Sequence, residues 1–164
     1  MRDIILIIMV AALAGCSKQP KQVSSSAAVG AITAPGHWHE TTILNDEANI
    51  QVCNERKEQY LIVLTEPKTD FQLSMSLEEF SNITRQGLVD AYRGKATQPQ
   101  QIKINGRDAI QSEIRGTVDG VGVFYLHVCV EGEKHFHQIL AWTTSALENK
   151  NRSVLESAIK TFKE

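Results

Sequence analysis

Apolar residues first gather in one uninterrupted block near the start of the chain. Residues 4–14 are all apolar and follow the basic residue Arg2. This run is too short for a membrane-spanning helix, which needs about 20 residues. A basic start, a run of about 7–15 apolar residues and small residues after it are typical of a secretory signal.

The apolar block ends in Leu13-Ala14-Gly15-Cys16. This sequence resembles the lipobox of bacterial lipoproteins. The resemblance implies that residues 1–15 are a signal peptide removed after Gly15, and that Cys16 carries a diacylglyceryl thioether and an acylated amine. Two or more acyl chains anchor a protein stably to a membrane. The alternative is an ordinary signal peptide that happens to end in cysteine.

The next segment has no apolar period. Residues 17–33 are rich in Ser, Gln, Lys and Ala, a composition typical of a flexible linker. We therefore expect residues 16–35 to form the lipidated cysteine and a tether. Residues 36–164 are then one globular domain, which is a normal size for a single hydrophobic core.

Periodic apolar positions begin again after the predicted tether. Residues 49–52 and 60–64 read as strands, the second of them apolar on both faces. A capping box at Ser76 and Glu79 predicts a helix whose apolar residues recur at helical spacing as far as Tyr92. Gly94 is the expected stop of that helix, and Gly87 inside it suggests that another element approaches closely.

The second half alternates with a period of two. Residues 101–104, 110–118, 121–130 and 135–144 read as strands, and Asn105-Gly106 and Asp119-Gly120 between them are strong hairpin signals. A last helix is expected at 148–162. Consecutive hairpins give antiparallel pairing, so the predicted fold class is α+β, an antiparallel β-sheet sandwiched by helices.

The net charge and the motifs that are absent exclude several classes of function. The formal net charge is −2 with both signs scattered, so no basic surface for nucleic acid is expected. The sequence has no Gly-rich phosphate loop, no Gly-x-Ser-x-Gly elbow and no His-Glu-x-x-His motif. We therefore predict no catalytic residues and no cofactor apart from the lipid on Cys16. The expected function is a binding or scaffolding module for an envelope protein or a cell-wall component.

Cysteine and histidine are the remaining candidates for chemistry. Cys53 and Cys129 would lie in an oxidising compartment, where they could form a disulfide or stay as two free, buried thiols. The alternative function is a periplasmic metal-binding protein that uses the His-x-His pairs, because alternate residues of a strand point the same way. Even pairing places His127 on the opposite face from the second pair, and local packing is the competing interpretation for all of them. The pairs are His37 with His39, and His135 with His137.

Several core and turn motifs resemble a known superfamily. They are residues 60–71 (YLIVLTEPKTDF), 76–80 (SLEEF), 104–109 (INGRDA), Asp119-Gly120, Phe124-Tyr125, residues 138–143 (QILAWT) and the terminal amphipathic helix. This region is similar to the DcrB/PsbP-like proteins, which also include a Ran-binding nuclear protein. The resemblance implies an antiparallel sheet between helices, binding or assembly roles, and no shared catalytic residues.

The residue after the lipidated cysteine suggests in which membrane the protein is anchored. In the enterobacterial sorting scheme that this pattern resembles, Asp at that position retains a lipoprotein in the inner membrane. Ser17 instead favours the outer membrane, with the domain facing the periplasm. The resemblance to DcrB points to the inner membrane, so that location stays open.

Overall fold

The computed structural model describes residues 19–25, 29–71 and 74–164. Cys16, Ser17 and the predicted signal peptide lie outside these residues. Within the described residues the chain forms ten strands and two α-helices. In order, they are β1 (Lys21–Ser24), β2 (Ala31–Ala34), β3 (His39–Glu40), β4 (Ile50–Asn54), β5 (Gln59–Pro67), α1 (Leu77–Ala91), β6 (Lys95–Ala96), β7 (Gln100–Ile104), β8 (Arg107–Val118), β9 (Val121–Glu131), β10 (His135–Thr144) and α2 (Glu148–Lys160).

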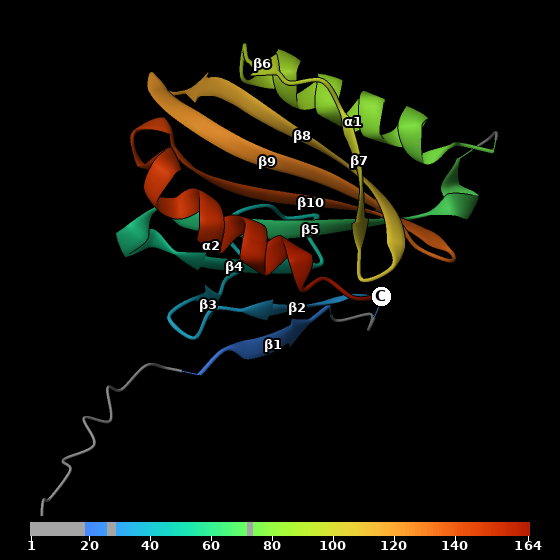
Figure 1. The fold of residues 1–164 in the computed structure, drawn as a ribbon, viewed down its shortest axis with the longest axis horizontal. Helices are drawn as coiled ribbons and strands as arrows, with labels where there is room; N and C mark the ends of the chain where they lie inside the picture. The colour runs from blue at the N-terminus through green and yellow to red at the C-terminus, as the bar shows by residue number, and fades with distance from the viewer. Residues whose placement is uncertain (1–18, 26–28, 72–73) are drawn as a thin grey trace, which may run out of the picture.

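One antiparallel sheet of eight strands organises the molecule. Its order is β3-β4-β5-β10-β9-β8-β6, and β7 pairs with β8. Helix α1 packs on one face, over β8, β9 and β10, while α2 packs on the other face, over β10, β5 and β9 (Figure 1). The predicted α+β fold, with the sheet between helices, is confirmed.

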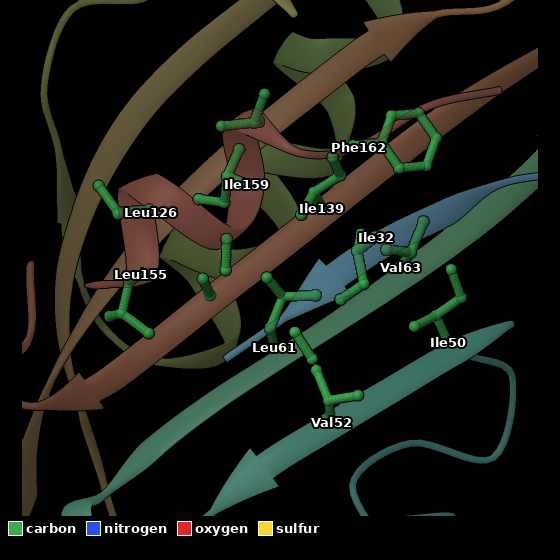
Figure 2. Close-up of a cluster of buried hydrophobic side chains, with 14 of the residues drawn as sticks. Ile32, Ile50, Val52, Leu61, Val63, Leu126, Ile139, Leu155, Ile159 and Phe162 are labelled. Carbon is green, nitrogen blue, oxygen red and sulfur yellow. The ribbon is translucent and has the colours of Figure 1, made fainter. Parts of the chain in front are cut away.

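The larger core lies between α2 and the sheet. Alternate residues of β9, from Phe124 to Val130, point into it, and Leu155 and Ile159 of α2 close it. Figure 2 shows Leu126, Leu155 and Ile159 gathered with Leu61, Val63 and Ile139 of the central strands. The other face has two smaller clusters, in which Phe80 and Leu88 of α1 pack on the sheet. Because successive side chains of a strand point to opposite faces of the sheet, they alternate between the face that α1 covers and the face that α2 covers.

Both tight hairpins form as predicted. Asn105 and Gly106 have φ of 47° and 85°, and Asp119 and Gly120 have φ of 49° and 81°. Positive φ at both central residues is the geometry of a type I′ turn, whose twist matches that of the flanking strands. The turns set the registers of β7 with β8 and of β8 with β9.

The ends of α1 agree with the sequence in part. The Ser76 hydroxyl accepts from the Glu79 N–H at 3.2 Å, and the Glu79 carboxylate accepts from the Ser76 N–H at 2.8 Å, which completes the capping box. At the other end Arg93, with φ of 47°, takes the left-handed position that was expected at Gly94. Gly94 is needed for another reason: a Cβ there would lie 2.8 Å from the carbonyl oxygen of Arg115.

The prediction of a flexible tether through residue 35 is wrong for the residues described. Strands β1 and β2 pair antiparallel, with Val23 opposite Ile32. Val23, Ile32 and Ala34 are buried, and all three belong to the larger core. In Figure 2 the Ile32 side chain lies among those of the central strands. Each short strand buries only one or two apolar residues, which gave too little periodicity to detect among Ser, Gln and Lys.

The two cysteines of the domain are free and buried. Cys53 lies in β4 and Cys129 in β9, and β5 and β10 separate these strands in the sheet. Three strand spacings amount to about 14 Å, whereas a disulfide needs Cα atoms within about 7 Å. The sheet order therefore excludes the disulfide between them.

Candidate functional site

A groove runs along the α1 side of the sheet. Its volume is about 280 Å³, just below the range of about 300–1,000 Å³ typical of small-molecule pockets. One bank is α1 and the other is Leu44 and Asn45. Strands β5, β9 and β10 form the floor, with Ile62, Leu64, Tyr125, Gln138, Leu140 and Trp142.

Four aromatic rings form a row at one end of the groove. Tyr60 stacks on Trp142 with ring centroids 5.3 Å apart, Trp142 lies 5.8 Å from Tyr125, and Tyr125 stacks on Tyr92 at 5.1 Å. The row crosses β5, β10 and β9 and reaches α1. Burial and the neighbouring Glu58 raise the pKa of Tyr60 to about 12, so its phenol stays neutral and acts as a hydrogen-bonding group.

The banks of the groove expose apolar surface. Ile43, next to Leu44, is 82% exposed, and Ile83, next to Thr84 of α1, is 61% exposed. Gly87 also lines the groove, and a Cβ built there meets nothing within 4 Å. The expected close approach of another element at Gly87 is therefore wrong, because the glycine faces open space.

The strand that floors the groove continues into an acidic region. Glu66 follows Leu64 on the same face of β5, where it pairs in register with Phe136. Burial raises the pKa of Glu66, and the negative charges of Glu47 and Asp70 raise it further. Among the described residues no cation forms an ion pair with Glu66. The strand just beyond this end of the groove therefore carries negative charge that no ion pair among the described residues neutralises.

A larger hollow lies elsewhere and has less distinctive walls. It measures about 590 Å³ and lies between β1 and residues 40–51. Of the described residues that line it, none is aromatic, and Glu40 is the charged one. Glu40 is also paired with Lys21. We take the smaller groove as the candidate site because its floor combines aromatic and apolar groups, and because the strand that floors it continues to Glu66.

His127 and Cys129 lie beneath α1, where they pack rather than react. The His127 Nε2 atom is 3.0 Å from the Thr84 hydroxyl and 3.5 Å from the Cys129 sulfur. Burial, with a smaller effect of Arg85, lowers the pKa of His127 to about 4. Burial raises the pKa of Cys129 to about 12. A protonated thiol is a poor nucleophile, so this pair has no reactive thiolate.

The first histidine pair does not act together. His37 Nε2 lies 3.3 Å from the Gln59 side chain, whereas His39 Nε2 lies 3.5 Å from the Cys53 sulfur and 3.2 Å from Glu55. Burial, helped by Glu55, raises the pKa of Cys53 to about 11. His39, Cys53 and Glu55 thus form a small cluster of their own, with a protonated thiol.

The second histidine pair meets a carboxylate from the end of the chain. His135 and His137 of β10 lie on the α2 side of the sheet with Glu164, and His127 lies on the opposite face, as even pairing predicts. Burial lowers the pKa of His137 against the opposing effect of Glu164. Burial also disfavours charge on Glu164, but the Glu133 N–H, Arg107 and the two histidines together lower its pKa.

The sequence did not reveal the groove or Glu164. The aromatic row combines residues from three strands with Tyr92, which directly follows α1, and the order of the strands in the sheet brings these distant residues together. The sequence pattern that could have indicated the groove is the alternation along β5, which places Tyr60, Ile62 and Leu64 on one face. Glu164 meets His135 and His137 through the path of the chain after α2, which no local pattern encodes.

Comparison with known proteins gives matches in structure and none in sequence. No protein-family model matches the chain, and no similar curated sequence was found. The fold is similar to that of cyanobacterial PsbP from Synechocystis sp. PCC 6803, with a TM-score of 0.67 and 11% identity over 95% of this chain and 98% of that one. It is also similar to LpqN, involved in cell envelope biogenesis of Mycobacterium tuberculosis, with a TM-score of 0.66 and 8% identity over 88% and 89% of the two chains.

A eukaryotic protein shares the same architecture. The Ran-binding protein Mog1p of Saccharomyces cerevisiae matches with a TM-score of 0.61 and 12% identity over 90% of this chain and 96% of that one. The chain has the PsbP/Mog1-like fold. At such low identity the likeness defines the fold, and function has to be argued from the chain's own residues. No helix among the described residues is long and apolar enough to cross a membrane.

Proposed function

We propose that this chain is a non-catalytic, lipid-anchored module of the bacterial envelope that binds an extended polypeptide segment of an envelope protein. The groove between α1 and residues 44–45 is the proposed binding site. The observation that carries the proposal is the combination of an aromatic and apolar floor with the unneutralised carboxylate of Glu66.

The chemistry of the groove favours a polypeptide with an apolar and a basic side chain. An apolar side chain can fill the space over Leu64 and Leu140, and a Lys or Arg side chain can pair with Glu66. Leu64 and Glu66 are two residues apart on one strand, roughly 7 Å. In an extended ligand the apolar and basic side chains would therefore also be two residues apart.

The aromatic row argues against a cell-wall glycan in the same groove. Tyr60 and Trp142 stack with an interplanar angle of 15°, and Tyr92 and Tyr125 with an angle of 9°. Ring faces that are stacked on each other are not free to stack on sugar rings. Their edges and polar tips remain, which suits contacts with side chains and peptide groups.

Two structural neighbours are compatible with a binding role. LpqN is described as involved in cell envelope biogenesis, and Mog1p as a Ran-binding protein. Neither description implies catalysis, and the raised pKa values of the buried thiols Cys53 and Cys129 make both of them poor nucleophiles. These points support a binding module without identifying its partner.

Lipid anchoring rests on Leu13-Ala14-Gly15-Cys16, which lies outside the described residues. With Cys16→Ser, the chain should move from the detergent phase to the aqueous phase in a detergent partition, or accumulate unprocessed. Cys53→Ser is the matched control and should partition like wild type. If Cys16→Ser also partitions like wild type, the anchor is not at this cysteine.

The proposed location of the anchor is the periplasmic leaflet of the outer membrane. Ser17 stands where Asp would retain the protein in the inner membrane, and it offers no carboxylate to the lipid headgroups. In an enterobacterial host, Ser17→Asp should move the protein toward inner-membrane fractions of a sucrose gradient. Ser17→Asn, which adds similar bulk without a charge, is the control. Wild type that sediments with inner-membrane markers would contradict the outer-membrane assignment.

A peptide selection tests the ligand chemistry directly. A random peptide library displayed against the tag-free chain should be enriched in peptides with an apolar residue two positions from Lys or Arg. Binding should change the tryptophan fluorescence, and Trp142→Phe should abolish the change. Glu66→Gln should weaken binding about 10-fold, equivalent to about 1.4 kcal/mol.

A carboxylate outside the groove provides the control. Asp108→Asn removes an exposed carboxylate of β8 that pairs with Lys103 and should leave peptide affinity unchanged. If Asp108→Asn and Glu66→Gln lose the same peptide affinity, the effect of Glu66→Gln comes from the net charge of the protein and not from its place beside the groove. Selection of peptidoglycan fragments in place of peptides would contradict the proposed occupant.

A further inference from the structure

Three potential metal ligands meet where the segment after α2 passes over the start of β10. His135 and His137 are alternate residues near the start of β10, and Glu164 follows α2. Glu164 Oε1 lies 3.4 Å from His135 Nδ1 and 3.4 Å from His137 Nε2. All three ligand atoms lie within 4.8 Å of one another.

The backbone after α2 is fixed in place by two other segments. Ala31 of β2 and Lys163 exchange backbone hydrogen bonds of 2.8 and 2.9 Å. The Asn105 side chain donates to the carbonyl oxygens of Lys160 and Phe162, at 3.1 and 2.6 Å. The position of Glu164 over β10 is therefore built into the fold rather than left to a free chain end.

The Glu164 carboxylate is oriented by two donors on one of its oxygens. The Glu133 N–H donates to Oε2 at 2.9 Å, and Arg107 pairs with the same oxygen at 2.7 Å. Oε1 is left facing the two imidazole nitrogens. Gly132 leaves the space for this, since a Cβ there would collide with the carboxylate.

His137 has a buried nitrogen with no hydrogen-bond partner. Its side chain is fully buried, and its Nδ1 lies 3.0 Å from the Thr65 hydroxyl. With Nδ1–H donating to Thr65, Nε2 presents a lone pair toward Glu164 Oε1, so that two acceptors face each other. The 3.4 Å approach does not have hydrogen-bond geometry, and Nε2 is left unsatisfied. Buried polar atoms are rarely left so, because each costs about 1–3 kcal/mol.

We propose that His135 Nδ1, His137 Nε2 and Glu164 Oε1 bind a Zn²⁺ ion. In a tetrahedral site with bonds of about 2.1 Å, neighbouring ligand atoms are about 3.4 Å apart, which matches both distances to Glu164. With the ion on Nε2, His137 Nδ1–H donates to the Thr65 hydroxyl 3.0 Å away, which is the role that outer hydrogen-bond partners of metal-bound histidines have. The His135 side chain is 22% exposed, which leaves the fourth position open to water or to a ligand atom from a partner.

The site differs in chemistry from the cluster of His39, Cys53 and Glu55. That cluster contains a sulfur atom, whereas the proposed site offers only nitrogen and oxygen. Cobalt(II) distinguishes the two, because a thiolate ligand adds an intense sulfur-to-cobalt charge-transfer band in the near ultraviolet. His39→Asn is accordingly the matched control for variants of the proposed site.

The test is isothermal titration of Zn²⁺ into the full chain, tag-free, purified in detergent and treated with chelator. One equivalent should bind, and His135→Asn and Glu164→Gln should each weaken binding at least 10-fold. Thr65→Val should weaken it by about 10–100-fold, and His39→Asn should have no effect. Circular dichroism of each variant confirms folding. The buried His137 is left unchanged, and Glu164→Gln removes the charge of its neighbour while it keeps the shape of the side chain.

Each other outcome overturns the proposal. Absence of Zn²⁺ binding, or binding that survives both His135→Asn and Glu164→Gln, removes the site. Loss of binding in His39→Asn together with the sulfur band would assign the ion to the other cluster. Equal binding of Mg²⁺ or Ca²⁺ would indicate unspecific carboxylate contacts. The peptide-binding proposal does not depend on any of these results.

Discussion

Ala31 and Lys163 exchange two backbone hydrogen bonds and join β2 to the segment after α2. The contact places β2 beside the segment that carries Phe162, whose ring lies against Gly30 and 4.9 Å from His137. Figure 1 shows β1 and β2 below the large sheet, near the C-terminus. The described residues of β1 and β2 are therefore part of the folded domain, and β2 supports the segment that positions Glu164.

The first prediction concerns this amino-terminal pair of strands. A chain that begins at residue 36 loses the buried side chains of Val23 and Ile32 and exposes their partners. At about 1.5–3 kcal/mol for each side chain, its free energy of unfolding should fall by about 3–6 kcal/mol. Urea denaturation measures the loss, and a chain that begins at residue 19 is the control.

A single substitution separates packing from chain length. Ile32→Ala should lower the free energy of unfolding by about 2–5 kcal/mol, because Ile32 is buried in the larger core. Thr33→Ala, next to it on an exposed position of β2, should have a much smaller effect. If the chain that begins at residue 36 unfolds at the same urea concentration as the longer one, β1 and β2 do not contribute to the core.

The second prediction compares two glycines in opposite surroundings. A Cβ at position 116 would lie 2.8 Å from the Tyr92 carbonyl oxygen, whereas a Cβ at position 87 meets nothing within 4 Å. Gly116→Ala should therefore destabilise the fold by about 1–3 kcal/mol. Gly87→Ala should stabilise it by about 0.5–1 kcal/mol, because alanine restricts the unfolded chain and suits a helix interior. Thermal or urea unfolding of the two variants gives the sign of each effect, and changes of the same sign would contradict the packing described.

The third prediction is a pH dependence from His127. Its pKa falls from 6.5 to about 4 on folding because the ring is buried. Between these values the unfolded chain binds a proton that the folded chain does not, so stability is full above about pH 6.5 and falls as the pH drops toward 4. The loss is on the order of 3 kcal/mol.

A variant isolates this effect from other titrating groups. His137 has a lowered pKa as well and acts in the same direction, so wild type must be compared with His127→Gln. Urea unfolding between pH 4 and 7 should show a flatter pH dependence in His127→Gln. Equal slopes in the two proteins would mean that His127 titrates alike in the folded and unfolded chains.

The fourth prediction concerns the charge left at the end of the groove. Because the pKa of Glu66 is raised on folding, the folded chain binds a proton that the unfolded chain has lost as the pH rises above the ordinary value. Its ionised form therefore destabilises the fold at neutral pH, and Glu66→Gln should raise the unfolding midpoint there. At a pH below the ordinary value the difference should vanish. A lower midpoint for Glu66→Gln at neutral pH would show that the carboxylate stabilises the fold.

Local patterns predicted the large elements well. The capping box at Ser76, the two turns that contain Gly106 and Gly120, and the alternation along β9 each depend on residues close in sequence. Their chemistry therefore appears directly in the order of the residues. The packing of α1 and α2 on opposite faces follows from the same alternation.

Features that depend on distant residues were missed or mistaken. Strands β1 and β2 bury one or two residues each, and several of their partners are more than a hundred residues away in α2 and the segment after it. The exclusion of a Cys53–Cys129 disulfide required the strand order. The same holds for Glu164 beside His137, since nothing near residue 164 signals a histidine on β10.

Site-specific photocross-linking in living cells tests the proposed binding groove most directly. A photoreactive phenylalanine analogue at Ile83, on the bank of the groove, is compared with the same analogue at Val121, which is 51% exposed at the turn between β8 and β9. The analogue at position 83 should give one discrete adduct with an envelope protein, abolished by Trp142→Ala and weakened by Glu66→Gln, while the analogue at position 121 gives none. The same adduct from both positions, or an adduct at 83 that survives Trp142→Ala, would contradict the assignment of this groove as the binding site.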